Sequence, residues 1–388
     1  MTRKQTIAIV LIIIILLPLL MWLGWIFTSK KKMVAVIVDK TVEMTDAEQH
    51  ASFTWVLNNL RFTKSKTTLY KNTNDYFGFF PMKDEKFRLK GLERFSTPML
   101  DKLSNDADLV YYTDTYGVYR KDWYKKRKAI GAGKIYGGLS EQDIQLLTMM
   151  KAKHKLIISE FNTIGTPTSD EIRGDFENLF GLKWSGWIGR YFSSLDTVNN
   201  PDLPQWIIDN YKKSNNGKWP FHRQGIVYIN TDEKMIVLEQ GNELTSALPY
   251  IYATDSIQKK YGIPAKTAYG YWFEVMKYDP SINEPIATFK LDVNAAGKEI
   301  LKKNNLPVSF PAILVHRNAD YKFYYFSGNF CDNPISMKSS YFRGIGVLNR
   351  LFYPSGELDN PRKFFWNFYN PLLTEIVSDY YQSLQKEK

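Results

Sequence analysis

The sequence predicts an α/β fold: a mainly parallel sheet flanked by helices, with an antiparallel elaboration and a transmembrane helix at the N-terminus. Short apolar runs without polar interruption, such as Leu156–Ile158, are typical of strands buried on both faces. Helix signals follow such runs, for example Ser140 and Asp143 at a helix start. This alternation of strands and helices indicates a parallel sheet covered on both faces. Later segments alternate polar and apolar residues, which is typical of antiparallel strands.

An uncharged apolar run near the N-terminus predicts a transmembrane signal anchor over residues 6–28, after a short tail at residues 1–5. The run has about 21 residues, enough to cross a hydrocarbon core. Arg3 and Lys4 precede it and Lys30–Lys32 follow it, so flanking charge leaves the orientation open. Long domains translocate with little regard to flanking charge. We therefore expect a single-pass protein of the cell membrane with its globular part outside the cytoplasm.

The stretch from His154 to Phe192 is the segment around which the rest of the chain is organised, and it contains several strand, turn and helix-capping patterns. After its buried strand, a turn of Gly, Pro and Thr leads to Thr168 or Ser169, either of which can cap a helix. That helix has acidic residues in its first turn, which suits the helix dipole, and ends at Gly181. The pattern predicts a strand, a turn and a helix in that order.

Polar residues follow three of the predicted parallel strands. They are Asp39 and Lys40 after Met33–Val38, Asp114 and Tyr116 after Ala107–Thr113, and Glu160 and Asn162 after Leu156–Ile158. Ligands of open α/β sheets bind just beyond the carboxyl ends of the strands. These side chains are therefore expected to meet at one edge of the sheet.

The other elements complete a chain long enough for one elaborated domain. The predicted helices span Pro201–Lys212, Ala295–Lys303, Tyr341–Phe352, Phe364–Leu384 and Ala47–Leu60, the last opened by a capping box at Thr45 and Glu48. The predicted strands are the pair Gly225–Asn230 and Met235–Glu239, the pair Tyr269–Tyr278 and Ile286–Val293, and a hairpin over Phe310–His316 and Tyr321–Phe326. Asp75–Pro81 is expected to be a turn-like aromatic segment, and Asn242–Ile263 is expected to be helical or irregular. We expect an α/β domain over residues 33–335, with an inserted region at about 240–305. C-terminal helices over residues 336–388 are expected to pack on it.

Several kinds of site are excluded by residue counts and spacing. The single cysteine, Cys331, excludes an intrachain disulfide and a cysteine-rich metal site. The four histidines lie far apart in the sequence without metal-ligand spacing, so no metal is predicted. The glycine-rich segment Gly131–Gly138 lacks the patterns that bind nucleotide phosphates. No cofactor is therefore expected.

The chain is basic, with a net charge of +11 and a basic, aromatic segment at Arg120–Lys128. Such a segment can contact nucleic acid, but an anchored chain favours anionic lipid head groups or an acidic polysaccharide as the partner. The alternative is a solvated loop without a partner. Nucleic acid is not expected.

Three segments together resemble a class I glutamine amidotransferase-like domain in the order of their elements. They are Asp108–Gly117, Lys155–Gly165 and Tyr321–Asp332. The resemblance implies a flavodoxin-like sheet over roughly residues 33–334, with the family's nucleophile elbow at the second segment. The family's catalytic Cys and His are missing: the elbow offers Ser159, Glu160 or Phe161, and the late loop offers Asn329 and Asp332. Without a thiolate the thioester route of an amidotransferase is closed.

Three carboxylates are the candidate catalytic residues: Glu160, Asp114 and Asp39. Two carboxylates about 5–10 Å apart can act as acid and base on a glycosidic bond, and close carboxylates raise one another's pKa. The alternative is structural, with these residues capping helices or pairing with Lys40 and Arg190.

Aromatic and cationic residues suggest a surface for sugar rings. Trp187, Tyr191 and Arg190 are the candidates, because aromatic faces suit C–H-rich surfaces and Arg forks bind hydroxyls or carboxylates. The alternative is a core beneath a loop, which we favour for Trp184. The candidate ligand contacts also include the polar residues Asn162, Tyr116 and Lys40.

Three functions remain open from the sequence. The first is an anchored, non-catalytic domain that binds a carbohydrate or cell-envelope polymer. The second is a carboxylate-based hydrolase of envelope glycans. The third is an accessory subunit of a membrane complex that makes or exports polysaccharide, for which the anchor and the late aromatic helix are the evidence.

Overall fold

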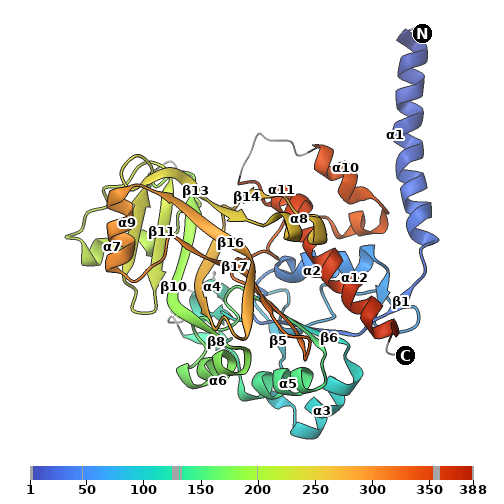
Figure 1. Cartoon of the computed structure of the whole chain (residues 1–388), viewed down its shortest axis with the longest axis horizontal. Coiled ribbons are helices and arrows are strands. Elements are labelled where there is room, and N and C mark those ends of the chain that lie inside the picture. The colour runs from blue at the N-terminus through green and yellow to red at the C-terminus, as the bar shows by residue number, and fades with distance from the viewer. Residues whose placement is uncertain are drawn as a thin grey trace.

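The structure is a computed structural model, and it describes residues 3–45, 47–124, 131, 133–198, 200–352 and 359–386. The described side chains leave out residues 3–4, 6–15, 247 and 350–352. The described chain is a mixed α/β fold built on a ten-stranded sheet (Figure 1).

Five parallel strands form the centre of the large sheet, in the order β4-β2-β6-β9-β18. They are β2 (Ala35–Asp39), β4 (Phe77–Pro81), β6 (Leu109–Tyr112), β9 (Leu156–Glu160) and β18 (Lys322–Phe326). Numbered by position in the chain, this order is 2-1-3-4-5, which is the flavodoxin-like order. The strand order reverses between β2 and β6, so the switch point lies beside the ends of these two strands.

Antiparallel strands extend the parallel centre on both sides. On one side they are β17 (Ser309–His316), β16 (Asn283–Val293), β13 (Leu244–Tyr252) and β14 (Lys266–Ala268), and on the other side β5 (Phe87–Lys90). The predicted mainly parallel sheet is therefore correct for the centre only, and the sheet as a whole is mixed. The number of antiparallel strands in this sheet was underestimated, because alternation of polar and apolar residues marks a strand without showing which sheet it joins.

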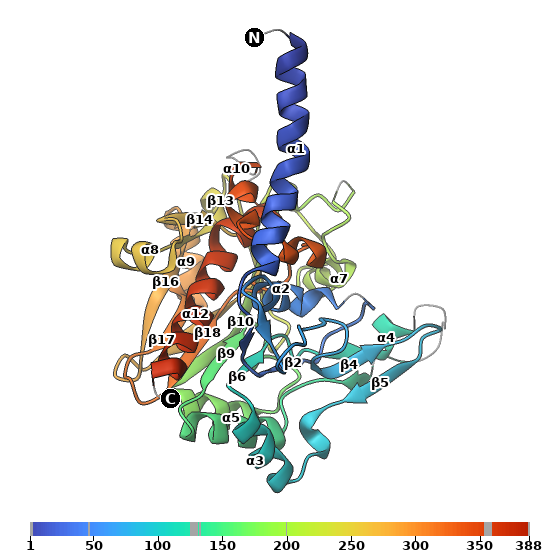
Figure 2. The ribbon, with the colours of Figure 1, turned by 90° about the vertical axis from the view of Figure 1, so that its right-hand side faces the viewer.

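Helices cover both faces of the parallel centre, as predicted (Figures 1 and 2). The first layer is α3 (Thr97–Asp106), α5 (Glu141–Ala152) and α6 (Asp170–Phe180), and the second contains α2 (Ala51–Asn59) and α12 (Asn370–Lys386). The side chains of Ile37, Tyr111, Ile158 and Tyr324 form one row across four strands and face the second layer. Their neighbours along each strand face the first layer, because strand side chains alternate.

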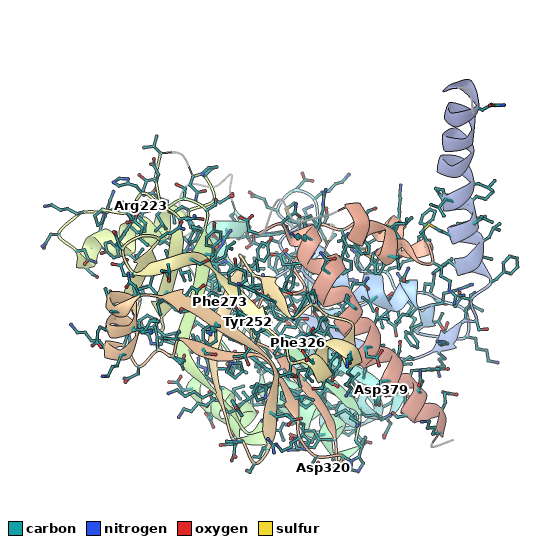
Figure 3. All side chains as sticks on the ribbon, turned by 45° about the horizontal axis from the view of Figure 1, so that its top comes forward. Arg223, Tyr252, Phe273, Asp320, Phe326 and Asp379 are labelled. Carbon is teal, nitrogen blue, oxygen red and sulfur yellow. The ribbon has the colours of Figure 1, made fainter. Side chains whose placement is uncertain are left out.

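A second, four-stranded antiparallel sheet has the order β12-β11-β10-β15. Its strands are β10 (Leu182–Phe192), β11 (Gly225–Asn230), β12 (Met235–Glu239) and β15 (Trp272–Tyr278), and a small apolar cluster links it to α7 (Gln205–Ser214). A bridge between Phe273 and Gly328 joins it to the large sheet just after β18. Phe273 lies in the interior between the two sheets and Phe326 lies in the core beside Tyr369, whereas Arg223 and Asp320 lie at the periphery (Figure 3).

Shorter elements complete the described chain. They are β1 (Lys31–Lys32), β3 (Phe62–Thr63), β7 (Val118–Tyr119), β8 (Lys134–Tyr136), α4 (Arg120–Trp123), α8 (Asp255–Tyr261), α9 (Ala295–Lys303), α10 (Ile345–Phe352), α11 (Pro361–Phe364), 3₁₀ turns at Glu48–His50, Leu92–Arg94 and Met337–Tyr341, and a π-helical turn at Phe365–Tyr369. The predicted domain boundaries stay a prediction.

The local helix signals of the central stretch are confirmed. Ser140 and Asp143 form a capping box at the start of α5, and the Ser169 side chain accepts a hydrogen bond from the α6 backbone. Gly181 ends α6 with a positive φ of 65°. These signals act over three or four residues, which is why the sequence alone located them.

Four predicted elements are wrong in part. The capping box at Thr45 and Glu48 is not formed, because Ala47 has a positive φ of 53° and α2 begins only at Ala51. The aromatic-rich residues 77–81 form the parallel strand β4, next to the edge strand β5, rather than a turn, and residues 244–252 form strand β13. The strands β15 and β16 exist but do not pair with each other: β15 pairs with β10, and β16 pairs with β13 and β17.

The N-terminal helix α1 (Arg3–Ile26) projects from the body of the protein (Figure 2). Arg61 holds its end, because its guanidinium donates hydrogen bonds to the carbonyl groups of Trp25, Ile26 and Thr28 and stacks on the Trp25 ring. Within the described residues, no helix is both long and apolar enough to span a membrane. The anchor over residues 6–28, its orientation and the membrane location stay predictions.

Candidate functional site

The carboxyl ends of β2, β6 and β9 bring the predicted polar residues to one edge of the large sheet. Lys40 N donates a hydrogen bond of 3.0 Å to the carbonyl of Asp114, and Thr115 N donates one to the carbonyl of Asn162. The three strand ends are thus tied together by main-chain contacts. The side chains, however, point into different surroundings, and this separates their roles.

Asp114 and Asn162 form the part of this edge that reaches solvent. Both side chains are half-buried, and Asn162 Nδ2 donates a hydrogen bond of 2.9 Å to Asp114 Oδ1. The backbone N–H of Tyr116 donates a second one, of 2.6 Å, to the same oxygen. The Tyr116 ring beside it is 38% exposed. Burial raises the pKa of Asp114 to about 7, with a further increase from Asp39 that the hydrogen bonds from Tyr116 and Asn162 partly offset.

Asp39 lies beneath this surface and is paired with a histidine. Its side chain is fully buried, and its Oδ2 lies 2.7 Å from Nδ1 of His50, also fully buried. Nε2 of His50 lies 2.6 Å from the Asn72 carbonyl oxygen, which can only accept, so Nε2 carries a proton. The short contact between Nδ1 and Asp39 is a buried hydrogen bond. Asp39 is a buried partner of His50, and it does not face solvent.

Glu160 is enclosed on the same face of the sheet as Asp39, the face covered by the second helix layer. Its Oε1 accepts hydrogen bonds from the hydroxyls of Tyr111, at 2.8 Å, and Tyr369, and its Oε2 accepts one of 3.1 Å from Cys331 N. Burial raises the pKa of Glu160 to about 7, although these hydrogen bonds oppose the shift. The carboxyl thus joins β9 to β6, to the loop after β18 and to the C-terminal helical segment. These contacts favour the structural alternative for Glu160.

Lys40 turns into the core between the large sheet and α5. Its Nζ lies 2.6 Å from Asp143 Oδ2 and 2.5 Å from Glu93 Oε1, and it also donates to the Gly138 carbonyl. Burial lowers the pKa of Lys40, but the two carboxylates outweigh burial and raise it. Lys40 is therefore satisfied by the buried Asp143 and the half-buried Glu93, neither of which is one of the three candidates. This burial favours a structural role for Lys40, and its contact with a ligand stays a prediction.

The side chains of β10 point alternately to its two faces, so the residues of the predicted sugar-binding surface do not lie on one face. Trp187 and Tyr191 are 7% and 6% exposed and belong to the main core. Trp184 is also buried, as predicted, and its Nε1 donates to the Trp187 carbonyl. Because side chains alternate along a strand, Arg190 points to the other face, where it is half-buried. The burial of Trp187 and Tyr191 favours the core alternative for both residues.

Several residues around this edge were missed by the sequence argument. His50, Tyr369, Glu93, Asp143 and Glu274 are buried or half-buried partners of the candidate groups. Only Asp143 had a local signal, as the capping residue of α5. The other four residues reach the candidate groups only through the tertiary fold, and no sequence motif marks them.

The edge offers hydrogen-bonding groups but no activated nucleophile. The Cys331 thiol is buried against Thr113 Oγ1 at 2.9 Å, and burial raises its pKa well above the usual range. The thiolate form is therefore disfavoured. Among the described side chains, no three His, Cys, Asp or Glu residues are arranged to hold a metal ion. The half-buried groups suit a ligand that donates and accepts several hydrogen bonds.

Comparison with known proteins identifies no family. No family model matches the chain, and no curated protein matches it. Solved structures that match the chain include a β-galactosidase from Bacillus circulans sp. alkalophilus (8% identity, TM-score 0.34, covering 77% of this chain and 30% of that chain). Others are the carbohydrate deacetylase Agd3 (10%, TM-score 0.34, 89% and 33%) and a putative ThuA-like protein from Bacteroides uniformis (9%, TM-score 0.34, 86% and 96%).

The chain thus spans about a third of the first two relatives and nearly all of the third. At these identities and TM-scores, function is inferred from the residues of this chain alone.

Proposed function

We propose that this protein binds a carbohydrate at the carboxyl edge of its parallel strands, through Asp114, Asn162 and Tyr116, without amidotransferase activity. The observation that supports this best is the half-buried Asp114 carboxyl, fixed by two hydrogen-bond donors beside an exposed tyrosine ring. Sugar hydroxyls donate to carboxylates and amide oxygens, and sugar C–H faces pack on aromatic rings. The switch point of an open α/β sheet is also the usual place for a ligand.

A polymer of the cell envelope is the ligand class to examine first, because the sequence predicts a membrane anchor at residues 6–28. Membership of a polysaccharide-exporting complex is a further possibility that the same predicted anchor suggests. Neither is required for sugar binding at Asp114.

A carboxylate-based hydrolase is the second candidate, because the pKa of Asp114 near 7 suits a general acid. It needs a second carboxyl that reaches the same substrate. Asp39 is enclosed against His50, and Glu160 is enclosed by Tyr111, Tyr369 and Cys331. Asp114 is the one candidate carboxyl of the three that is not fully buried, so binding is the function we favour.

The test is a glycan array probed with the full-length chain, the Asp114→Asn variant and the Tyr116→Ala variant. Loss of a hydrogen bond to a charged group is worth roughly 1.5–3 kcal/mol, so Asp114→Asn should weaken binding about tenfold to a hundredfold. Tyr116→Ala should weaken binding to the same glycans.

Two matched controls are available. Asp106 is exposed at the end of α3, before the opposite end of β6 from Asp114, and Tyr252 on β13 is 37% exposed, close to Tyr116. Asp106→Asn and Tyr252→Ala should bind as the unchanged chain does. Equal binding by Asp114→Asn would refute the proposed site. Release of shorter sugars by the unchanged chain, and not by Asp114→Asn, would replace binding with hydrolysis.

A further inference from the structure

Arg190 is a half-buried cation with no ion-pair partner among the described residues. Its guanidinium lies against two aromatic rings, 4.8 Å from the centroid of Phe192 on the same strand and 5.7 Å from that of Trp272 on β15. Arg190 and Trp272 are directly opposite in the register of the small sheet. Nε of Arg190 is buried and has no hydrogen-bond partner among the described residues. No described carboxylate lies within ion-pairing distance of its guanidinium.

Arginine stays charged under ordinary conditions, so its buried Nε donor has an unmet requirement for a hydrogen-bond acceptor. Burying a charge without a partner costs free energy, and the usual solutions are an ion pair or a bound anion. The two rings stabilise the cation but provide no hydrogen-bond acceptor in the guanidinium plane. An anionic group from a ligand would meet the requirement, and the planar fork of Arg matches a carboxylate.

The loop after β18 brings Asp332 and Asn329 toward Arg190. This loop crosses the ends of β9 and β6, where Cys331 contacts Glu160 and Thr113, and Asn329 N donates a hydrogen bond of 2.9 Å to the Trp272 carbonyl. Asn329 is half-buried and Asp332 is exposed, and Asn329 Nδ2 donates to Asp332 Oδ2 at 3.3 Å. Asp332 lies within electrostatic range of both Arg190 and the buried Asp39.

We infer that Arg190 binds the carboxylate of a uronic-acid residue, while Asp332 accepts a hydrogen bond from a neighbouring sugar hydroxyl. This inference rests on the proposed carbohydrate binding and specifies an acidic ligand. A uronic acid carries one negative charge beside hydroxyl donors, which complements a cation with a carboxylate nearby. Asp332 and the exposed Asp202 lie within electrostatic range of Arg190, and their negative charge disfavours a doubly charged phosphate.

The experiment compares acidic polysaccharides with their carboxyl-reduced forms, in which each uronic acid has become a neutral sugar with unchanged linkages. Polygalacturonate, polyglucuronate and alginate are immobilised in both forms and probed with the full-length chain. The variants are Arg190→Gln, Arg190→Lys, Arg223→Gln and Asp114→Asn. Arg223 lies exposed on the small sheet and serves as the control for loss of one positive charge (Figure 3).

We expect the unchanged chain to bind at least one acidic polymer about tenfold or more tightly than its reduced form. Arg190→Gln should remove this difference while leaving the weaker binding to the reduced form in place, because that binding uses Asp114 and Tyr116. Arg190→Lys should restore it only in part, since an ammonium lacks the planar fork. Arg223→Gln should behave as the unchanged chain. Matching thermal unfolding curves for the five proteins would show that the variants are folded.

The outcomes separate this inference from the proposed function. Equal binding to acidic and reduced forms, lost in Asp114→Asn, would overturn the role of Arg190 and keep carbohydrate binding. An acid preference that depends on Arg190 but not on Asp114 would keep the inference and overturn the proposed site. An acid preference lost equally in Arg223→Gln would show general charge attraction and overturn the inference. Absence of binding to every polymer would overturn both.

Discussion

Replacing Lys40 with methionine should destabilise the protein by about 3–5 kcal/mol, the usual cost of removing one partner from a buried ion pair. Lys40 and Asp143 are both fully buried, and Glu93 completes the cluster. The Lys40→Met variant fills a similar volume but leaves Asp143 without its cation. The hydroxyl of Tyr112 and the capping contacts to Ser140 are then the groups left to stabilise that carboxylate. Urea unfolding of both chains would measure the loss.

A matched control exists in the ion pair between Lys64 and Asp75, whose side chains are 33% and 18% exposed. Lys64→Met should cost about 1 kcal/mol or less, because solvent screens such a pair. Adding Asp143→Asn to Lys40→Met should recover part of the stability, since the uncompensated charge is then removed. A cost for Lys40→Met no larger than that for Lys64→Met would contradict the account of this cluster.

The stability of the protein should fall as the pH rises from about 5 to 8. Burial raises the pKa of Glu274 from 4.5 to about 8, against opposing hydrogen bonds from Tyr325 and the Asn162 backbone, and burial raises that of Glu160 to about 7. The folded chain therefore holds protons that the unfolded chain releases in this window, so each increase in pH favours unfolding. At roughly 1.4 kcal/mol per pKa unit, Glu274 alone contributes on the order of 4 kcal/mol. The urea midpoint at several pH values would measure this dependence.

The Glu274→Gln variant identifies the group responsible. Glutamine keeps the shape and an acceptor for the Tyr325 hydroxyl but does not ionise. We expect the variant to lose much less stability between pH 5 and 8 than the unchanged chain. Glu171→Gln, an exposed change in the first turn of α6, should leave the dependence in place. Parallel pH profiles for the unchanged chain and Glu274→Gln would contradict a raised pKa at this position.

The sequence predicted those parts of the fold whose signals are local. Unbroken apolar runs identified β2, β6 and β9, and capping residues identified α5 and α6. Strand partners were harder to predict. The alternating pattern of residues 272–278 marks a strand but does not specify its neighbour, and β10 rather than β16 occupies that place. Such pairings depend on packing across the whole chain.

For the candidate site too, local features could be predicted from the sequence and long-range contacts could not. The positions of Asp39, Asp114 and Glu160 at strand ends followed from local patterns, because parallel strands place their carboxyl ends together. Their environments did not follow, since the groups that enclose them are distant in sequence. Glu160 receives hydrogen bonds from Tyr369, 209 residues away, and Cys331, 171 residues away. Those partners decide that Glu160 is enclosed while Asp114 stays accessible.

The most direct test of the proposed function is a crystal structure of the full-length chain with a sugar that the array selects. We predict that the sugar lies at the carboxyl edge of the parallel strands, with a hydroxyl donating to Asp114 and a ring face on Tyr116. A sugar bound away from Asp114, Asn162 and Tyr116, for example beside Tyr252 on β13, would contradict the account.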